Sequence, residues 1–371
     1  MKGFICFTTG ILLFGSVVFS AKAAFTNLYV FGDSISSTTD NPAPLGPYYY
    51  GKRYSNGRVW VEVLAQRQGL TLYSTNNNSY FGNTSTSIIA SVANFTAPLG
   101  VNMSNILFVI WVNNADLFYP AQNNGTDLHA WTNAMNVSLT NHFKAITNLY
   151  AKGARILVLP NVVDLSTIPQ FNTSANTNFV HQRCIDYNVA FAATLNRVRT
   201  NFTLYPGLTI YIPDFFTLLT NILAYPASYS VTNALSAKGH SVDVIDSSLS
   251  DTTTNGPGTN YIFWDPQDPT AKVHMWMGNL AQQLISPVQI SNITMDDDEE
   301  SIRLDMANVP VGQNGLVLGR TNLILGRWTT NTLSNNTNVF NSTNTTQSVF
   351  VPSSGPVRFY RLNFPYSWTW P

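Results

Sequence analysis

Two continuous apolar runs constrain the fold of this 371-residue chain more than any other feature. They lie within Asn105–Val112 and Arg155–Pro160, and they lack polar alternation, as expected for strands covered on both faces. Between them, Ala130–Ala151 has apolar residues at helical spacing, and Phe179–Val198 predicts a second helix. The succession of strand, helix, strand and helix predicts a parallel sheet with helices on both faces.

A shorter apolar run, Leu28–Phe31, leads directly into Gly32, Asp33 and Ser34. Glycine permits a sharp turn, and Ser34 would then lie at the carboxyl end of a strand, where open α/β sheets bind ligands. A serine exposed there can attack an ester carbonyl if a base takes its proton. On these three residues alone an ordinary turn would be favoured, but possible partners later in the chain favour a nucleophile.

The N-terminal residues have the pattern of an export signal. Lys2 precedes the apolar stretch Phe4–Phe19, and Ala21-Lys22-Ala23 provides a small-x-small cleavage pattern. Residues 1–23 are therefore predicted to be a signal peptide, and the mature protein to be secreted, periplasmic or at the cell surface. No later stretch reaches about 18 apolar residues, so no integral membrane segment is expected after cleavage.

The charge composition argues against a polyanionic partner. Lys and Arg total 19, Asp and Glu total 19, and only 10% of residues are charged, so no nucleic-acid footprint is predicted. No cysteine or histidine spacing typical of a metal site occurs, and no phosphate-binding loop, so no cofactor or metal is expected. The acidic run Asp296–Glu300 matches no calcium loop and favours a solvated linker. We expect a monomer.

The length predicts two domains, because a single core seldom grows beyond about 250–300 residues. From Ser286 onward, short strand-like runs separated by Asn-, Thr- and Gly-rich turns indicate a small all-β unit. These runs are Gly315–Gly319, Ser348–Pro352 and Arg358–Phe364. The predicted division is 24–288 and 289–371.

Four segments together resemble the SGNH/GDSL hydrolases, a family of secreted esterases and lipases. They are Gly32–Ile35, the "GRFSNG"-like Tyr50–Ala65, Asn78–Asn83 and the closing block Phe263–His274. The resemblance implies a flavodoxin-like three-layer fold with about five parallel strands, and an acyl-enzyme formed on Ser34. It implies that the backbone N–H groups of Ser34 and Gly82 bind the oxyanion. A small ester, a lipid or an acylated glycan would be the substrate.

The closing block departs from the family pattern at the catalytic base. Asp268 occupies the position of the family's histidine, and a carboxylate with an unperturbed pKa near about 3.9 is a poor proton acceptor. Asp268 followed by Pro269 is also typical of a helix N-cap. His274 is then the alternative base, with Asp265 as the orienting carboxylate. However, a helix starting at Pro269 would place His274 roughly 8 Å beyond the cap and on another face.

The third family block is altered as well. Trp111–Leu117 places Asn113 where the family has glycine and Ala115 where it has the oxyanion asparagine. Asn114 lies one residue out of register and presents its amide only if the loop bends differently. Loss of one oxyanion donor costs roughly 10²–10³ in rate.

Three functions therefore remain open: an exported ester hydrolase, a catalytically impaired hydrolase fold that binds glycan or lipid, and a surface interaction protein. The third function would depend on the C-terminal unit. There, Thr321–Trp328 and Phe350–Leu362 are similar to small β-sandwich modules of exported bacterial hydrolases. Trp368 and Trp370 would either stack on sugars or close that core.

Overall fold

Five parallel strands form the central sheet of the computed structural model. Their order is β2-β1-β3-β4-β5, which is the flavodoxin-like order, and β1 is paired on both sides. The parallel sheet predicted from the apolar runs is therefore confirmed. The strands are β1 (Asn27–Gly32), β2 (Asn77–Ser79), β3 (Ile106–Trp111), β4 (Ile156–Val158) and β5 (Thr209–Tyr211).

The structure describes most of the chain, but several segments fall outside it. The predicted signal peptide, the acidic run 296–300 and the aromatic tail with Trp368 and Trp370 all lie outside the described residues. Among the described residues, no helix has the length and apolarity needed to cross a membrane. The described ranges are 25–41, 49–231, 254–295, 301–320, 328–330, 339–352 and 359–364.

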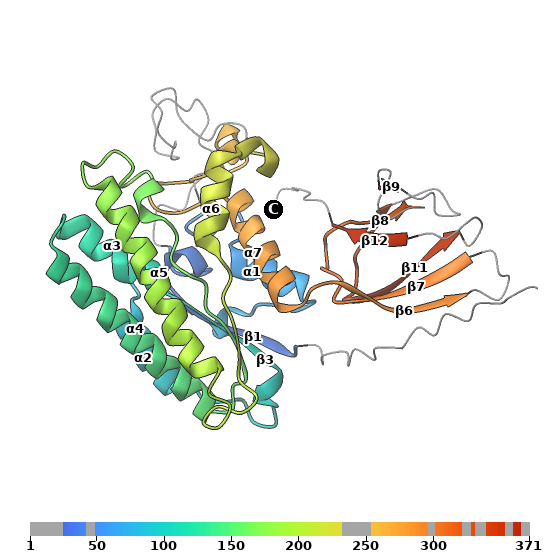
Figure 1. Cartoon of the computed structure of the whole chain (residues 1–371), viewed down its shortest axis with the longest axis horizontal. Helices are drawn as coiled ribbons and strands as arrows, with labels where there is room; N and C mark the ends of the chain where they lie inside the picture. The colour runs from blue at the N-terminus through green and yellow to red at the C-terminus, as the bar shows by residue number, and fades with distance from the viewer. Residues whose placement is uncertain are drawn as a thin grey trace, which may run out of the picture.

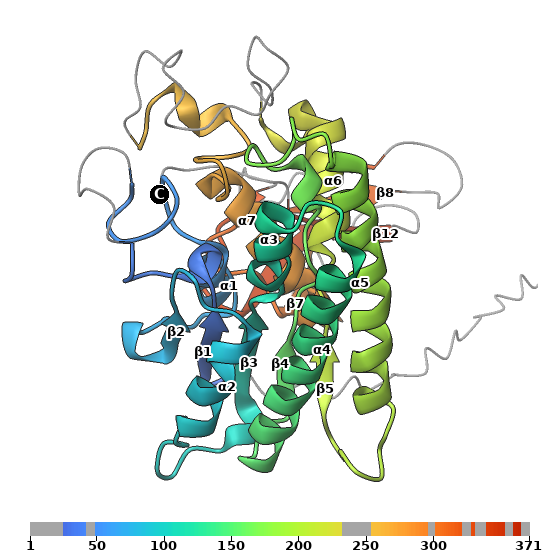
Figure 2. The same cartoon turned by 90° about the vertical axis from the view of Figure 1, so that its left-hand side faces the viewer.

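Helices cover both faces of the sheet. Figure 2 shows α2, α4 and α5 in front of the strands and α1 and α7 behind them. The two helices expected from sequence exist: α4 begins two residues earlier than predicted and ends at the predicted Ala151, and α5 extends slightly beyond both predicted ends. For α4 the reason is Asp127, whose side chain accepts the N–H groups of His129 and Ala130 and so starts the helix earlier. The helices are α1 (Trp60–Arg67), α2 (Ser85–Asn94), α3 (Asn113–Asn123), α4 (Leu128–Ala151), α5 (Thr177–Arg199), α6 (Phe215–Ala224) and α7 (Ala271–Ile285).

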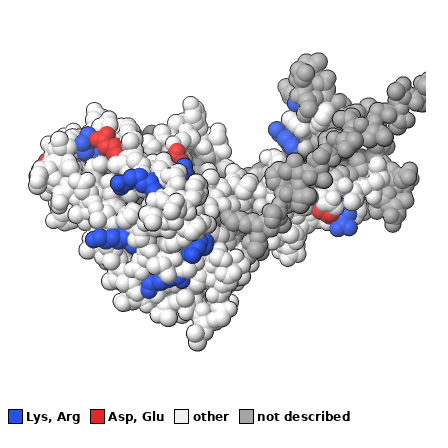
Figure 3. Space-filling model, turned by 60° about the horizontal axis from the view of Figure 1, so that its bottom comes forward, with Lys and Arg blue, Asp and Glu red and all other residues white. Residues whose placement is uncertain are grey.

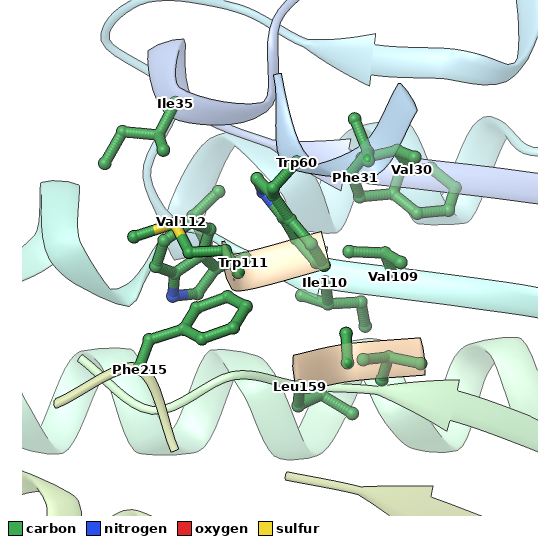
Figure 4. Packing of buried hydrophobic residues seen from close by; sticks show 14 of the residues in the cluster. Val30, Phe31, Ile35, Trp60, Val109, Ile110, Trp111, Val112, Leu159 and Phe215 are labelled. Atoms are coloured by element: carbon green, nitrogen blue, oxygen red, sulfur yellow. The ribbon is translucent and has the colours of Figure 1, made fainter. Parts of the chain in front are cut away.

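Three aromatic rings pack against one another beneath the carboxyl ends of the strands. Trp60, Trp111 and Phe215 are fully buried, with ring centroids 5.0–5.5 Å apart in edge-to-face contacts (Figure 4). The indole of Trp60 also donates to the Ser36 hydroxyl at 3.0 Å. This cluster therefore fixes the turn that follows β1.

The C-terminal part consists of antiparallel strands in two further sheets. One has the order β11-β7-β6, and the other has β10-β8-β12 with β9 beside β8. Sequence runs predicted β8, β11 and β12, whereas β6 and β7 were not predicted. Figure 1 shows these strands on one side of α1 and α7. The strands are β6 (Gln289–Met295), β7 (Ser301–Ala307), β8 (Gly315–Arg320), β9 (Thr329–Thr330), β10 (Val339–Phe340), β11 (Thr346–Pro352) and β12 (Phe359–Asn363).

A buried arginine joins the two parts. The Arg67 guanidinium of α1 donates to Asn279 Oδ1 at 2.9 Å and to the Val311 carbonyl at 2.9 Å. The N–H of Val311 in turn donates to the Arg67 carbonyl at 3.2 Å. These bonds satisfy polar groups that burial would otherwise leave unpaired.

Candidate active site

Ser34 lies immediately after the central strand β1. The chain leaves β1 at Gly32, and Ser34 opens a short 3₁₀ turn, η1 (Ser34–Ser36). The Asp33 side chain caps this turn by accepting the Ile35 N–H at 3.2 Å. Gly32 is required here, because an added Cβ would lie 2.7 Å from Ser79 Oγ.

The nearest described partner of the Ser34 hydroxyl is a carboxylate. Ser34 Oγ donates to Asp268 Oδ1 at 3.1 Å, although 234 residues separate them in the sequence. The Asp268 residue is only 2% exposed. The position at which the family has its histidine is therefore next to the serine, and in this chain it carries an aspartate.

The expectation that Asp268 caps the following helix is wrong. Helix α7 begins at Ala271, with Thr270 as its N-cap residue. Its first N–H, that of Ala271, donates to the Asn56 side chain at 2.8 Å, so a distant residue supplies the cap. Pro269 instead forms an isolated β-bridge with Phe263. The Asp268 side chain is thereby left to contact Ser34.

Asp265 holds the backbone of the loop that carries Asp268. Its Oδ1 accepts the N–H groups of Gln267 at 2.8 Å and Asp268 at 2.7 Å, and its Oδ2 accepts the Tyr49 hydroxyl at 2.9 Å. Asp265 thus orients Asp268 rather than an imidazole ring. Tyr49 belongs to no motif recognised in the sequence, and no signal pointed to it.

The local electrostatics make Asp268 a stronger base than an ordinary aspartate. Burial raises its pKa well above the usual range, and the nearby charges of Asp265 and Asp33 act in the same direction, while the Ser34 hydroxyl opposes them. Burial also raises the pKa of Asp33 to about 7, with a contribution from Asp116. The objection that a carboxylate is too weak a base applies to an exposed aspartate, not to this one.

His274 lies in the packing between α1 and α7. It is fully buried, and its Nδ1 accepts the Trp60 N–H at 3.2 Å. Burial lowers its pKa to about 3, which suits a neutral hydrogen-bond acceptor. Among the described residues, His274 Nε2 has no partner, and His274 does not line the pocket around Ser34. The structure brings Asp268, not His274, to Ser34.

Asn114 lines the pocket around Ser34. Its Oδ1 accepts the Val163 N–H at 3.0 Å, which fixes the orientation of the side chain. Its Nδ2 is buried and has no acceptor among the described residues. The preceding Asn113 is turned the other way, donating to the Pro160 carbonyl at 2.9 Å. The shifted register therefore leaves one unpaired amide donor on a residue that lines the pocket, although Ala115 cannot provide one.

Gly82 lies in the loop between β2 and α2. Its backbone φ is +79°, a conformation that favours glycine. Two side chains fix this loop: Asp40 accepts the Phe81 N–H at 2.5 Å, and Asn83 Nδ2 donates to the Gly32 carbonyl at 3.0 Å. Asp40 was not identified from sequence.

These groups surround a pocket of about 440 Å³. Ser34, Gly82, Asn114 and Asp268 share it with apolar side chains, and no Lys or Arg is among the residues that line it. On the face drawn in Figure 3, charged side chains are few and scattered. The lining residues are Asp33, Ser34, Ile35, Phe81, Gly82, Thr84, Asn114, Ala115, Phe118, Tyr119, Gln122, Val163, Leu165, Ile168, Gln267 and Asp268.

The remaining described histidines have other surroundings. His129 lies in the first turn of α4, His142 is buried in the same helix, and His181 contacts Asp164 Oδ2 at 2.6 Å. His240 lies outside the described residues. Within the described ranges, no group of three or more His, Cys, Asp or Glu side chains is arranged to hold a metal ion.

Comparison with solved structures found chains that are similar over about 70% of this chain, all at low sequence identity. One is Est24, a carbohydrate acetylesterase from Sinorhizobium meliloti (11% identity, 69% of this chain and 97% of that chain, TM-score 0.37). A second is the lipase Lip_vut3 from a goat rumen metagenome (10%, 70% and 97%, TM-score 0.39). A third is Axe2, an acetylxylan esterase from Geobacillus stearothermophilus (12%, 70% and 93%, TM-score 0.36).

Sequence comparison identifies the family. A search of curated proteins gave no significant match. The sequence model described as GDSL-like lipase/acylhydrolase matches residues 28–281, which is more than half of the chain and includes all five strands of the parallel sheet. The chain therefore belongs to the GDSL-like lipase/acylhydrolase family of ester-bond hydrolases.

Proposed function

We propose that this protein is a serine esterase in which Asp268 replaces histidine as the general base. The observation that carries the proposal is the hydrogen bond from Ser34 Oγ to Asp268 Oδ1 at 3.1 Å. A general base must lie within about 2.6–3.2 Å of the group whose proton it takes. Of Asp268 and His274, the two residues of the closing block considered as the base, Asp268 meets this requirement.

The reaction proceeds through an acyl-enzyme. Ser34 Oγ attacks the ester carbonyl and its proton passes to Asp268, while the carbonyl oxygen becomes an oxyanion. The backbone N–H groups of Ser34 and Gly82 and the Asn114 amide donate to this oxyanion. Collapse of the intermediate breaks the bond to the alcohol, which leaves with the proton from Asp268. Water then repeats the sequence, with Asp268 taking its proton and returning it to Ser34.

The first test identifies the nucleophile. We expect a fluorophosphonate probe to label the native protein at Ser34, and the Ser34→Ala variant to lose both labelling and hydrolysis of p-nitrophenyl esters. Intact-mass and peptide mass spectrometry locate the label. Labelling that persists in Ser34→Ala would show that another serine reacts.

The second test identifies the base. Asp268→Asn keeps the shape of the side chain but cannot accept the proton, so we expect kcat/KM to fall by roughly 10²–10⁴-fold. The control is His274→Leu, which removes the acceptor of the Trp60 N–H. It should lower the melting temperature, with a cost of about 1–3 kcal/mol, and leave kcat near the native value. The opposite pattern would assign the base to His274.

The pH dependence follows from the raised pKa of Asp268. Only the ionised carboxylate accepts a proton, so kcat/KM should be low below this pKa and rise as the pH increases through it. The pH at which kcat/KM rises should therefore lie well above the usual pKa range of an aspartate. In Asp268→His it should move to the range of histidine, near about 6.5. A native profile that is flat from acidic to alkaline pH would contradict the assignment.

The impaired-site alternative remains the competing function. It requires that the Asp268 carboxyl stay protonated throughout the working range, so that Ser34 is never activated. Binding of lipid or glycan without labelling of Ser34 at any pH would support it. The same proteins and assays decide between the two functions.

We also propose that the protein is exported as a monomer and consists of a hydrolase domain, 24–288, and an all-β domain, 289–371. The change from parallel to antiparallel sheets after α7 supports this division. Export rests on the sequence pattern of residues 1–23. N-terminal sequencing of the protein recovered outside the cytoplasm should begin at Ala24, whereas recovery of the uncleaved chain inside the cell would contradict export.

A further inference from the structure

One face of α3 forms a wall of the pocket that begins at the oxyanion donor. Asn114, Phe118 and Gln122 are four residues apart, so they lie one above another on the helix, with Ala115 and Tyr119 beside them. At 1.5 Å per residue, this face extends about 12 Å from Asn114 to Gln122. The Asn114 amide is therefore at one end of this face. The rings of Phe118 and Tyr119 follow, and Gln122 lies at the other end.

The opposite wall is apolar and well fixed. Val163, Leu165 and Ile168, from the segment that follows β4, line the same pocket and are each at least 95% buried. The ring of Phe118 packs on Phe171 of this segment, with centroids 5.0 Å apart, which joins the two walls. The space between them is part of the folded structure rather than a loose surface crevice.

Polar and apolar groups are separated along this space. Ser34 and Asp268 lie at the end marked by Asn114, while the walls beyond carry no charged side chain among the lining residues. In ester hydrolysis the base returns its proton to the departing alcohol, so the alcohol leaves on the side of Asp268. The acyl group is left to occupy the apolar space.

We propose that the space between α3 and the segment Val163–Ile168 is an acyl-chain subsite for uncharged, unbranched acyl groups of about eight to ten carbons. This inference rests on the proposed attack of Ser34 on an ester carbonyl. An extended chain advances about 1.2 Å per bond, because a three-bond residue spans at most about 3.6 Å. The 12 Å face of α3 thus accommodates roughly ten bonds. Tyr119 and Gln122 mark its outer end.

The chain-length profile tests the subsite directly. With p-nitrophenyl acetate, butyrate, hexanoate, octanoate, decanoate and palmitate, kcat/KM should rise up to about fourfold per added methylene, the ratio that corresponds to about 0.8 kcal/mol of apolar transfer. The rise should end near octanoate or decanoate, with palmitate no better. Acetate as the best substrate, or a flat profile, would overturn the inference.

A matched pair of variants tests where the acyl-chain subsite lies. Tyr119 and Tyr73 are both exposed tyrosines, at 66% and 59%, but only Tyr119 lines the pocket. Tyr119→Ala should lower the ratio of decanoate to butyrate activity by about fivefold or more, and Tyr73→Ala should leave it unchanged. Equal ratios in the two variants would place the acyl chain elsewhere.

Binding to the inactive Ser34→Ala variant separates this inference from the proposed function. Uncharged butyramide and octanamide are the ligands, measured by calorimetry. If octanamide binds more tightly by the same factor per methylene, the subsite exists even in the absence of turnover, and only the catalytic proposal fails. If esters are cleaved but neither rates nor binding depend on chain length, the subsite is wrong and the chemistry of Ser34 stands.

Discussion

The parallel register of the central strands positions the proposed oxyanion donors, because it aligns the ends of those strands. Gly32 of β1 pairs with Ser79 of β2 on one side and with Trp111 of β3 on the other. The segments that follow these three strand ends contain Ser34, Gly82 and Asn114, so three stretches that are distant in sequence meet at one edge of the sheet. Gly32 allows this meeting, since any side chain there would collide with Ser79 and Ser36. A shift of register would move the serine away from its donors.

Burying ionised aspartate side chains at this site costs folding free energy. Asp33, Asp265 and Asp268 are each at least 94% buried. Backbone N–H groups and the Tyr49 hydroxyl offset this cost for Asp265. Asp268 instead faces Ser34, and burial together with its acidic neighbours raises its pKa. The burial that would destabilise an ordinary ionised carboxylate also raises the pKa of Asp268, which is what the proposed role as proton acceptor requires.

Long apolar patterns made the framework predictable, whereas local turns did not. The strands β1, β3 and β4 and the helices α4 and α5 were predicted because each buries a continuous apolar run or an apolar stripe. β2 and β5 have three residues each, as β4 does, but neither is part of a continuous apolar run. Sequence placed Ser34, Gly82 and Asp265 near one another through the family resemblance, and the pocket contains the first two. It could not show that Asn56 caps α7 and leaves Asp268 free, or that Val163 orients the Asn114 amide, since both depend on tertiary hydrogen bonds.

A carboxylate base changes the charge balance of the reaction. When a histidine takes the proton from serine, an imidazolium forms beside the growing oxyanion and attracts it. In the proposed reaction Asp268 loses its own negative charge as it takes the proton, so no positive charge forms beside the oxyanion. With no Lys or Arg among the lining residues, the developing charge is then stabilised mainly by N–H donors. The orientation of Asn114 by Val163, and of the Gly82 loop by Asp40 and Asn83, therefore matters more here than in a site that forms an imidazolium.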